Sequence, residues 1–348
     1  KSGNRYTYAE GSPVTNLFMN LKYLIARDNI YMNTYDLTEV YGVGNVKLLQ
    51  NNHYLPMGFM TNSALASWQV DENEDQFNPF DKQNEFFKLA TGIKNDVYTP
   101  LDVVSQGHTD YNQFPVNKTG YGRYSFSCTD TTVTPHVKWN YEAPKDGLYL
   151  MYADISGGDD VTVMINDVAQ SKTYGMGRSY IACIGQCKKG DKISVYSNLQ
   201  QGQSGSAMVF VDVLNQDVFE EGYNKLSKSV MTTTKLTGSS MEGTINAQEN
   251  GLFYTSVPYE EGWKAYVDGK EVKITPVGNA LVAFNLAKGE HTIKLEYYPK
   301  GFAIGLTVTI ICAATFAFLC VWTYIIKKRR KKKGDISENP EEVQINAE

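Results

Sequence analysis

The feature that most constrains this chain is a long apolar stretch near its C-terminus. Residues 302–326 form 25 consecutive positions without a charge, and seven basic residues, 327–333, follow directly. An α-helix rises about 1.5 Å per residue, so this stretch can cross a hydrocarbon layer about 30 Å thick. A buried core helix is the alternative, but such helices rarely run this far without a polar face. We therefore predict a transmembrane helix over 301–326.

The charges beside this helix predict its orientation. Segments rich in Lys and Arg stay on the cytoplasmic side of a membrane. We therefore expect 327–348 to be a basic cytoplasmic tail and 1–300 to be extracellular at the cell membrane. Residues 1–30 lack a signal-peptide pattern, so either a signal peptide has been removed or further membrane spans precede Lys1. A tail anchor with a cytoplasmic domain would contradict the charge rule.

Composition argues against several classes of protein. Before the helix lie 26 of the 33 basic and 33 of the 38 acidic residues, which gives this part a net charge near −7. Such a surface argues against nucleic acid as a partner. The four His and five Cys residues follow no metal-ligand spacing, so we expect neither a metal nor a cofactor. Cys183 and Cys187 frame a short turn and could form a disulfide.

The first part of the chain predicts strands and one helix. Residues 38–41 and 46–49 have the composition of two strands joined by a Gly-containing turn. A helix is expected over 78–93, because Asn78 can cap it and Pro79 suits its first position. Its apolar side chains recur with helical spacing at Phe86, Leu89, Ala90 and Ile93.

From about residue 121 apolar side chains recur at every second position, which is the spacing of a β-strand. Turns recur at intervals of roughly 8–15 residues, a spacing typical of an antiparallel sandwich. A helical or Thr-rich connector is expected over 215–240, and a loop-rich linker over 95–120. The predicted strands are 121–127, 132–141, 147–155, 161–166, 179–184, 192–197 and 207–214.

The segment 243–299 predicts a strand at 252–258 and two hairpins. The first joins 263–267 to 270–274 through Asp268-Gly269, a sequence typical of type I′ turns. The second joins 281–286 to 291–298 through Lys288-Gly289.

Two residues of the first hairpin have competing interpretations. Asp268 precedes Gly269, so we interpret it as a turn residue and not as a catalytic carboxylate. Trp263 alternates with Ala265 and Val267, which predicts that its ring fills the core. A ring of this kind could instead stack on a sugar.

Together these patterns predict a mainly β protein. It should contain jelly-roll-like antiparallel β-sandwich domains outside the membrane, a small α/β N-terminal segment and one C-terminal transmembrane helix. The expected parts are a membrane-proximal α/β segment (1–94), a linker (95–120), a β-sandwich domain (121–240), a β-hairpin block (241–300), the membrane helix (301–326) and the basic tail (327–348).

Several segments resemble a known family. Residues 262–270 read GWKAYVDGK, 288–302 read KGEHTIKLEYYPKGF, and 51–59 read NNHYLPMGF. These segments, together with 21–25 and the helix after 78, resemble the C-terminal part of bacterial YfhO-like membrane proteins. The motif positions, expected to be structural or glycan-facing, are Asn51, Leu55, Pro56, Gly58, Phe59, Gly262, Trp263, Asp268, Gly269, Gly289 and His291.

The resemblance implies a polytopic, GT-C-like glycosyltransferase. Such an enzyme takes a sugar from a polyprenyl-phosphate carrier and passes it to a cell-surface polymer, lipoteichoic acid in Gram-positive bacteria. Its acidic catalytic residue is expected in an early external loop, which these 348 residues do not include. The resemblance therefore implies an extracellular C-terminal part without catalytic residues. Its implied partners are the lipid bilayer, a polyprenyl-linked sugar and a teichoic-acid-like polymer.

The acidic residues of the chain do not predict an enzyme by themselves. Glycoside hydrolysis needs two carboxyl groups about 5–10 Å apart, one with a raised pKa. We expect the acidic pairs on solvated surfaces and no carboxylate in a paired, apolar setting. The alternative function is a single-pass surface protein whose β-sandwich binds a glycan or a protein. The acidic pairs are Asp71/Glu72, Asp159/Asp160, Glu220/Glu221 and Glu260/Glu261.

Overall fold

The structure is a computed structural model, and it describes residues 11–27, 36–70, 77–107, 116–128, 132, 135–158, 160–174, 180–202 and 204–334. Within them the chain forms 22 strands, four α-helices and one 3₁₀ helix, η1 (Ser63–Ser67). The sheets are antiparallel, so the predicted mainly β class with a C-terminal apolar helix is confirmed. His108, Asp71, Glu72, Asp159 and the tail after Gly334 lie outside the described residues.

The chain divides into two compact units. The larger contains residues 1–259 and 264–296, and the smaller contains 260–263 and 297–348. Sheets I to V, defined below, belong to the larger unit, apart from the ends of two strands of sheet III.

Two stacked sheets form a β-sandwich. Sheet I has the order β13-β10-β15-β8-β7, with β5 paired to β15, and sheet II has the order β12-β11-β14-β9-β6. Between them lie aromatic side chains that include Trp139, Tyr124 and Tyr149. The strands of sheet I are β5 (Tyr98–Pro100), β7 (Val116–Gly120), β8 (Arg123–Ser127), β10 (Gly147–Ile155), β13 (Ala182–Cys187) and β15 (Ser204–Leu214). Those of sheet II are β6 (Ser105–Gly107), β9 (His136–Glu142), β11 (Val161–Ile165), β12 (Val168–Tyr174) and β14 (Lys192–Asn198).

The sandwich differs from the prediction in two places. The segment 95–120, predicted as a linker, contributes β5, β6 and β7 to the two sheets. These strands have three to five residues, too few to show a period of two. β12 was not predicted, because its polar sequence at the edge of sheet II does not alternate. It follows β11 through Asn166 and Asp167, both with positive φ, as a type I′ turn requires.

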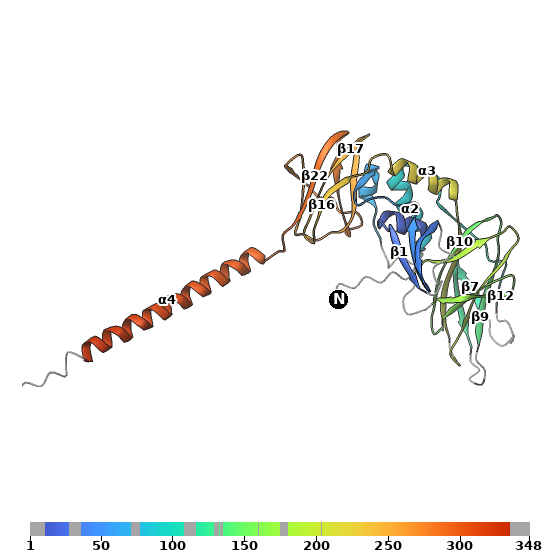
Figure 1. Ribbon diagram of the computed structural model, residues 1–348. Helices are drawn as coiled ribbons and strands as arrows, with labels where there is room; N and C mark the ends of the chain where they lie inside the picture. The colour runs from blue at the N-terminus through green and yellow to red at the C-terminus, as the bar shows by residue number, and fades with distance from the viewer. Residues whose placement is uncertain are drawn as a thin grey trace, which may run out of the picture. The chain divides into compact units, whose positions relative to one another are not determined.

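Three helices pack against the outer face of sheet I (Figure 1). They are α1 (Pro13–Phe18), α2 (Pro79–Thr91) and α3 (Gln216–Leu226). The predicted helix is confirmed as α2. Asn78 Oδ1 accepts a hydrogen bond from the Phe80 N–H at 3.0 Å, and Gly92 ends the helix in a left-handed conformation. Apolar residues of these helices share one core with Phe210 of sheet I and Tyr254 of sheet IV.

Two further sheets contain most of the C-terminal strands. Sheet III has the order β16-β17-β22-β19-β20, and sheet IV the order β21-β18-β4. Sheet III consists of β16 (Thr232–Leu236), β17 (Ser240–Ala247), β19 (Trp263–Val267), β20 (Lys270–Val272) and β22 (Gly289–Tyr297). Sheet IV consists of β4 (Phe59–Thr61), β18 (Gly251–Pro258) and β21 (Leu281–Leu286).

One of the two predicted hairpins is confirmed and the other is wrong. Val267 pairs with Lys270 across the Asp268-Gly269 turn, as predicted. The second hairpin does not form, because β21 belongs to sheet IV and β22 to sheet III. In β21 three consecutive residues, 282–284, are fully buried. A strand buried on both sides needs cover on both faces, which an edge of sheet III would not supply.

Sheet V is small and has the order β1-β3-β2. Its strands are β1 (Tyr23–Arg27), β2 (Leu37–Val43) and β3 (Val46–Asn51). Val43 pairs with Val46, so the predicted hairpin around Gly44 is confirmed.

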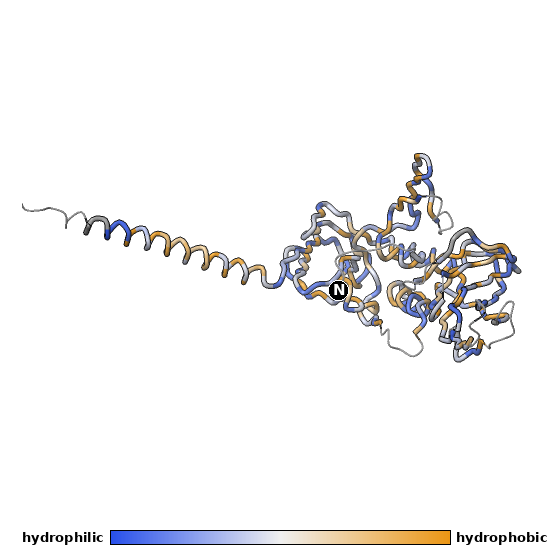
Figure 2. The backbone as a smooth tube through the Cα atoms, turned by 90° about the horizontal axis from the view of Figure 1, so that it is seen from below, coloured by the Kyte–Doolittle hydropathy of each residue, from blue (hydrophilic) through white to orange (hydrophobic). Residues whose placement is uncertain are grey.

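The C-terminal helix α4 (Phe302–Gly334) belongs to the smaller unit. Of the helices described, it alone is long and apolar enough to cross a membrane, over Phe302–Arg330. Figure 2 shows its apolar stretch followed by a hydrophilic end. The helix continues beyond the predicted limit of 326 into the basic residues, because Lys and Arg are good helix formers.

Candidate functional site

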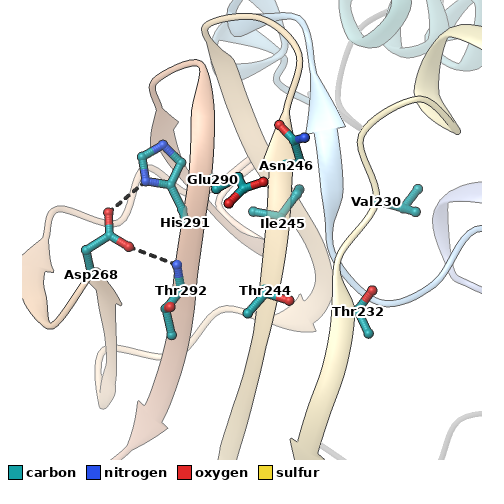
Figure 3. Close-up of a pocket in the computed structure, with 9 residues that line it drawn as sticks. All are labelled: Val230, Thr232, Thr244, Ile245, Asn246, Asp268, Glu290, His291 and Thr292. Carbon is teal, nitrogen blue, oxygen red and sulfur yellow. Dashed lines mark hydrogen bonds and ion pairs between the residues drawn. The ribbon is translucent and has the colours of Figure 1, made fainter.

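An open depression of about 630 Å³ lies where β16, β17 and β22 run side by side (Figure 3). It brings together two of the predicted motif residues, Asp268 and His291, with polar residues that the sequence did not single out. The lining residues are Val230, Thr232, Thr244, Ile245, Asn246, Asp268, Glu290, His291 and Thr292.

Strand pairing places the polar side chains of this depression in two rows. Thr232 pairs with Thr244, which pairs with Thr292, so three hydroxyl groups follow one another across neighbouring strands. Strands in a sheet lie about 4.8 Å apart. Two residues further along, Asn246 pairs with Glu290. None of these five side chains bonds to another residue of the described chain, so all five are available to a ligand.

The Asp268 carboxylate is held by two hydrogen bonds (Figure 3). Its Oδ2 atom lies 2.8 Å from Nδ1 of His291, and its Oδ1 atom accepts the Thr292 N–H at 2.8 Å. The His291 bond, followed by the backbone bond, lowers the pKa of Asp268 below its ordinary value of 3.8. Asp268 is therefore ionised at neutral pH and cannot serve as a general acid.

Both ring nitrogens of His291 lie within hydrogen-bond distance of neighbouring oxygen atoms. Its Nε2 atom lies 3.1 Å from the Ala287 carbonyl oxygen, and its Nδ1 atom faces the Asp268 carboxylate. The Ala287 carbonyl oxygen and the ionised Asp268 carboxylate are both hydrogen-bond acceptors. His291 thus joins the turn after β19 to β22 and leaves no nitrogen free for a base or a ligand.

The depression suits hydroxyl-rich ligands better than it suits catalysis. It contains two carboxylates, Asp268 and Glu290, and the pKa of Asp268 is lowered, whereas the acid of a glycoside hydrolase needs a raised pKa. No group of His, Cys, Asp and Glu residues that could hold a metal occurs within the described ranges. Threonine hydroxyls, an amide and a carboxylate can instead exchange hydrogen bonds with the hydroxyls of a polyol or sugar. Among the described residues that line the depression there is no Phe, Tyr or Trp, so a sugar would lack a large ring to stack on there.

Comparison with known proteins places the chain in a family. The family model described as bacterial membrane protein YfhO matches residues 1–309. The chain belongs to the YfhO family. An uncharacterized YfhO protein of Bacillus subtilis (strain 168) is 29% identical over 136 residues, which are 36% of this chain and 14% of that relative. The matched region is therefore a small part of that YfhO protein.

Solved structures resemble parts of the chain only weakly. A family 35 carbohydrate binding module from Clostridium thermocellum aligns with a TM-score of 0.23 and 12% identity, over 33% of this chain and 96% of the module. A Paenibacillus sp. cycloisomaltooligosaccharide glucanotransferase aligns with a TM-score of 0.22 and 9% identity, over 56% of this chain and 45% of the enzyme. Likenesses this weak say nothing about the ligand of the YfhO chain.

Four of the five named YfhO motif residues in 51–59 are buried, and Pro56 is half-buried. Asn51, at the end of β3, donates from its side chain to the Leu21 carbonyl at 2.9 Å and accepts from the His53 N–H at 3.0 Å. Leu55 and Phe59 are buried in the core beneath the helices. The remaining motif residues, Pro56 and Gly58, lie between them, with the Pro56 carbonyl accepting from Asn20 and Gly58 close to the Phe253 ring. This motif connects β3 of sheet V to β4 of sheet IV.

The second YfhO motif divides between the two units. Gly269 completes the turn after β19, and Gly289 begins β22 beside His291, both in the larger unit. Gly262 and Trp263 belong to the smaller unit. Trp263 is only partly buried and packs on Tyr297 with ring centroids 5.2 Å apart. The prediction that Trp263 fills the core is therefore wrong, because Trp263 is the first residue of β19 and lies at the end of that strand.

Sequence analysis missed a buried carboxyl group, Asp212. It is 1% exposed in β15, and its Oδ1 atom has no hydrogen-bond partner among the described residues. Burial, with a smaller effect of Asp81, raises the pKa of Asp212 well above 3.8. The sequence analysis expected no carboxylate in a paired, apolar setting and did not foresee this single carboxyl group in an apolar one. A single Asp within the apolar run MVFVDVL was the only available signal.

The sequence also predicted that the acidic pairs are exposed and that Cys183 and Cys187 could form a disulfide. Asp160, Glu221, Glu260 and Glu261 are exposed, as predicted. Glu220 differs, because its carboxylate contacts Nε2 of His53 at 2.8 Å and is partly buried. The three cysteines of the larger unit are buried and form no disulfide, so no bond joins Cys183 to Cys187.

Proposed function

We propose that this chain is the extracellular C-terminal part of a YfhO-family membrane glycosyltransferase. The whole enzyme would transfer a sugar from a polyprenyl-phosphate carrier to a cell-surface polymer such as lipoteichoic acid. In this proposal the chain described here does not perform the chemistry. Its depression on sheet III would contact the hydroxyl groups of the acceptor polymer and hold it near the membrane.

The observation that carries the proposal is the row of unpaired polar groups in the depression of a YfhO-family chain with a membrane helix. Thr244, Thr292 and Asn246 can donate or accept hydrogen bonds, and Glu290 accepts them. A glycan or polyol-phosphate chain offers many such groups in series. Several weak contacts along one polymer can together give useful affinity through effective concentration.

The proposal is tested in cells that carry the full-length protein. We expect deletion of the gene to remove a sugar substituent from a surface polymer, measured by sugar analysis of purified lipoteichoic acid, and the wild-type gene to restore it. The double variant Asn246→Ala/Glu290→Gln should restore less, because two of the five available groups are changed. Thr233→Val, on the opposite side of β16, is the matched control. Unchanged polymer sugar after gene deletion would disprove the glycosyltransferase role.

The proposed orientation has a separate test. Lys270 is exposed beside the β19–β20 turn, so a cysteine there would be reachable by reagents. A membrane-impermeant maleimide should label Lys270→Cys in intact cells. Labelling that occurs only after lysis would place this region in the cytoplasm. The three natural cysteines before the membrane helix are buried, which keeps their background labelling low.

A further inference from the structure

The four residues 260–263 lie far from the membrane helix in sequence but belong to its structural unit. The smaller compact unit contains these four residues together with 297–348. The residues just before and after them, up to 259 and from 264, belong to the larger unit. Gly262 and Trp263 are two of the YfhO motif positions, yet neither contributes to the depression. Their contacts suggest a different role.

This segment, which we call the 260–263 loop, is fastened to the residues just before α4. The Tyr298 N–H donates to the Gly262 carbonyl at 2.9 Å. A Cβ atom on Gly262 would come within 2.4 Å of the Tyr298 carbonyl oxygen and 2.7 Å of the Tyr297 ring, so only glycine allows this approach. The side chains of Glu261 and Lys300 form an ion pair across the same contact.

Aromatic side chains gather at this contact and remain partly exposed. Trp263 packs on Tyr297 with an angle of 51° between the rings. Tyr298 is 57% exposed and Phe302, the first residue of α4, is 65% exposed. Trp and Tyr carry an apolar ring and a polar group, and they are enriched where membranes meet water.

The chain geometry brings this cluster close to the membrane. Only four residues separate the end of β22 at Tyr297 from Phe302. The Phe302 N–H donates to the Pro299 carbonyl at 3.1 Å, which shortens that connection. The apolar helix begins at Phe302, and the headgroup layer adds roughly 5–8 Å on each side of the hydrocarbon core. Tyr298 and the loop bonded to it therefore fall at the depth of the lipid headgroups.

We propose that the 260–263 loop is a membrane-interface contact, with Trp263, Tyr297 and Tyr298 seated among the lipid headgroups. The occupant of this partly exposed aromatic surface is the bilayer itself, because the surface is continuous with a helix that enters the bilayer. In this proposal the Trp263 ring contacts lipid headgroups, and it neither fills the protein core nor stacks on a sugar. It does not depend on the glycosyltransferase proposal.

The test measures the depth of Trp263 in the full chain reconstituted into phosphatidylcholine–phosphatidylglycerol vesicles. The Trp263 emission is the difference between the wild-type chain and Trp263→Phe. Lipids with a nitroxide on the headgroup should remove most of this emission, whereas aqueous acrylamide should remove little. Trp322, near the other end of the membrane span, serves as a positive control through Trp322→Phe. Trp139, buried in the sandwich, should respond to neither quencher.

A second variant separates the interface contact from a merely structural role. Gly262→Ala should push the loop away from Tyr298, reducing headgroup quenching of Trp263 while leaving quenching of Trp322 unchanged. The proposal is overturned if headgroup nitroxides leave the Trp263 emission intact while acrylamide quenches it freely. It is also overturned if soluble teichoic-acid-like polymer shifts the Trp263 emission of the reconstituted chain while headgroup nitroxides leave that emission unchanged.

Discussion

Aspartate lies in opposite environments on the helix-covered face of sheet I and on the outer face of sheet III. In sheet I, Asp212 is buried among apolar side chains and its pKa is raised. Beside sheet III, Asp268 lies in an exposed turn, and its bonds to His291 and Thr292 lower its pKa. Burial beneath the helices thus favours the neutral form of Asp212, whereas hydrogen bonds favour the charged form of Asp268. Environment, more than residue type, decides what a carboxyl group can do.

The sandwich core and the outer face of sheet III also differ in the side chains that they contain. The sandwich core holds fully buried aromatic residues such as Trp139 and Tyr149. The outer face of sheet III instead presents threonines, an amide and a carboxylate. Substitutions in the first region should therefore change stability, and those in the second should change binding with little effect on unfolding.

The largest effect is expected at Trp139. Its ring is fully buried, with its centroid 5.4 Å from that of Tyr124. Trp139→Ala should lower the free energy of unfolding by about 3–5 kcal/mol, because it leaves a cavity between the sheets. Thermal unfolding of the purified chain in detergent, followed by near-ultraviolet circular dichroism, measures this loss. Trp139→Phe, which keeps most of the ring volume, should cost much less, and equal losses would argue against cavity formation.

The next effect is a gain at Asp212. An unfolded chain ionises this carboxyl above its ordinary pKa of 3.8, whereas the folded chain keeps the proton to a higher pH. Stability contributed by the protonated group is therefore complete below about pH 4 and is lost as pH rises toward the folded pKa. Asp212→Asn cannot ionise and should be more stable than wild type by about 1–3 kcal/mol near pH 7.

The pH series is the control for this prediction. Urea unfolding between pH 4 and pH 8 should show the advantage of Asp212→Asn shrinking toward zero at the acidic end. A constant advantage across that range would mean that the carboxyl group does not titrate in the way its burial implies. Asp268→Asn should not reproduce the gain, because the pKa of Asp268 is lowered and not raised.

A loss comparable to the gain at Asp212 is expected at Gly269. Its φ of 77° lies in the left-handed region, and a Cβ atom there would meet no atom within 4 Å. Gly269→Val should therefore cost about 1–3 kcal/mol through backbone strain alone. Gly269→Asn should cost less, since Asn tolerates this conformation. Thermal melts that rank the two variants in the reverse order would contradict a purely conformational cause.

The smallest effect is expected at Trp263. Because its ring is partly exposed and contacts mainly Tyr297, Trp263→Ala should cost about 1 kcal/mol or less in detergent. Two tryptophans of one chain would then differ several-fold in their effect on unfolding. A loss at Trp263 as large as that at Trp139 would show that the ring supports the core after all.

Local patterns predicted elements well where one short segment contains the whole signal. The capped helix after Asn78 and the Asp268-Gly269 turn depend on neighbouring residues, and both are confirmed. Sheet membership depends on distant partners, so Lys288-Gly289 looked like a hairpin although its strands enter different sheets. The alternation of Trp263 with Ala265 did not show where the sheet ends.

The candidate site was less predictable than the fold. Asp268 and His291 were noted as motif residues, but nothing in the sequence indicated that they bond to each other. The threonine row arises from the pairing of three strands whose register is fixed by the whole sheet. Asp212 could not be recognised, because its burial depends on helices that approach from other parts of the chain.

The position of β22 within sheet III has a mechanical consequence. This strand leads directly toward the membrane helix, and it is hydrogen-bonded on both sides, to β17 and to β19. A force along the chain from Phe302 would pull β22 lengthwise between its two neighbours. The bonds of an antiparallel sheet run across the strands, so such a pull loads many of them together in shear instead of breaking them one at a time.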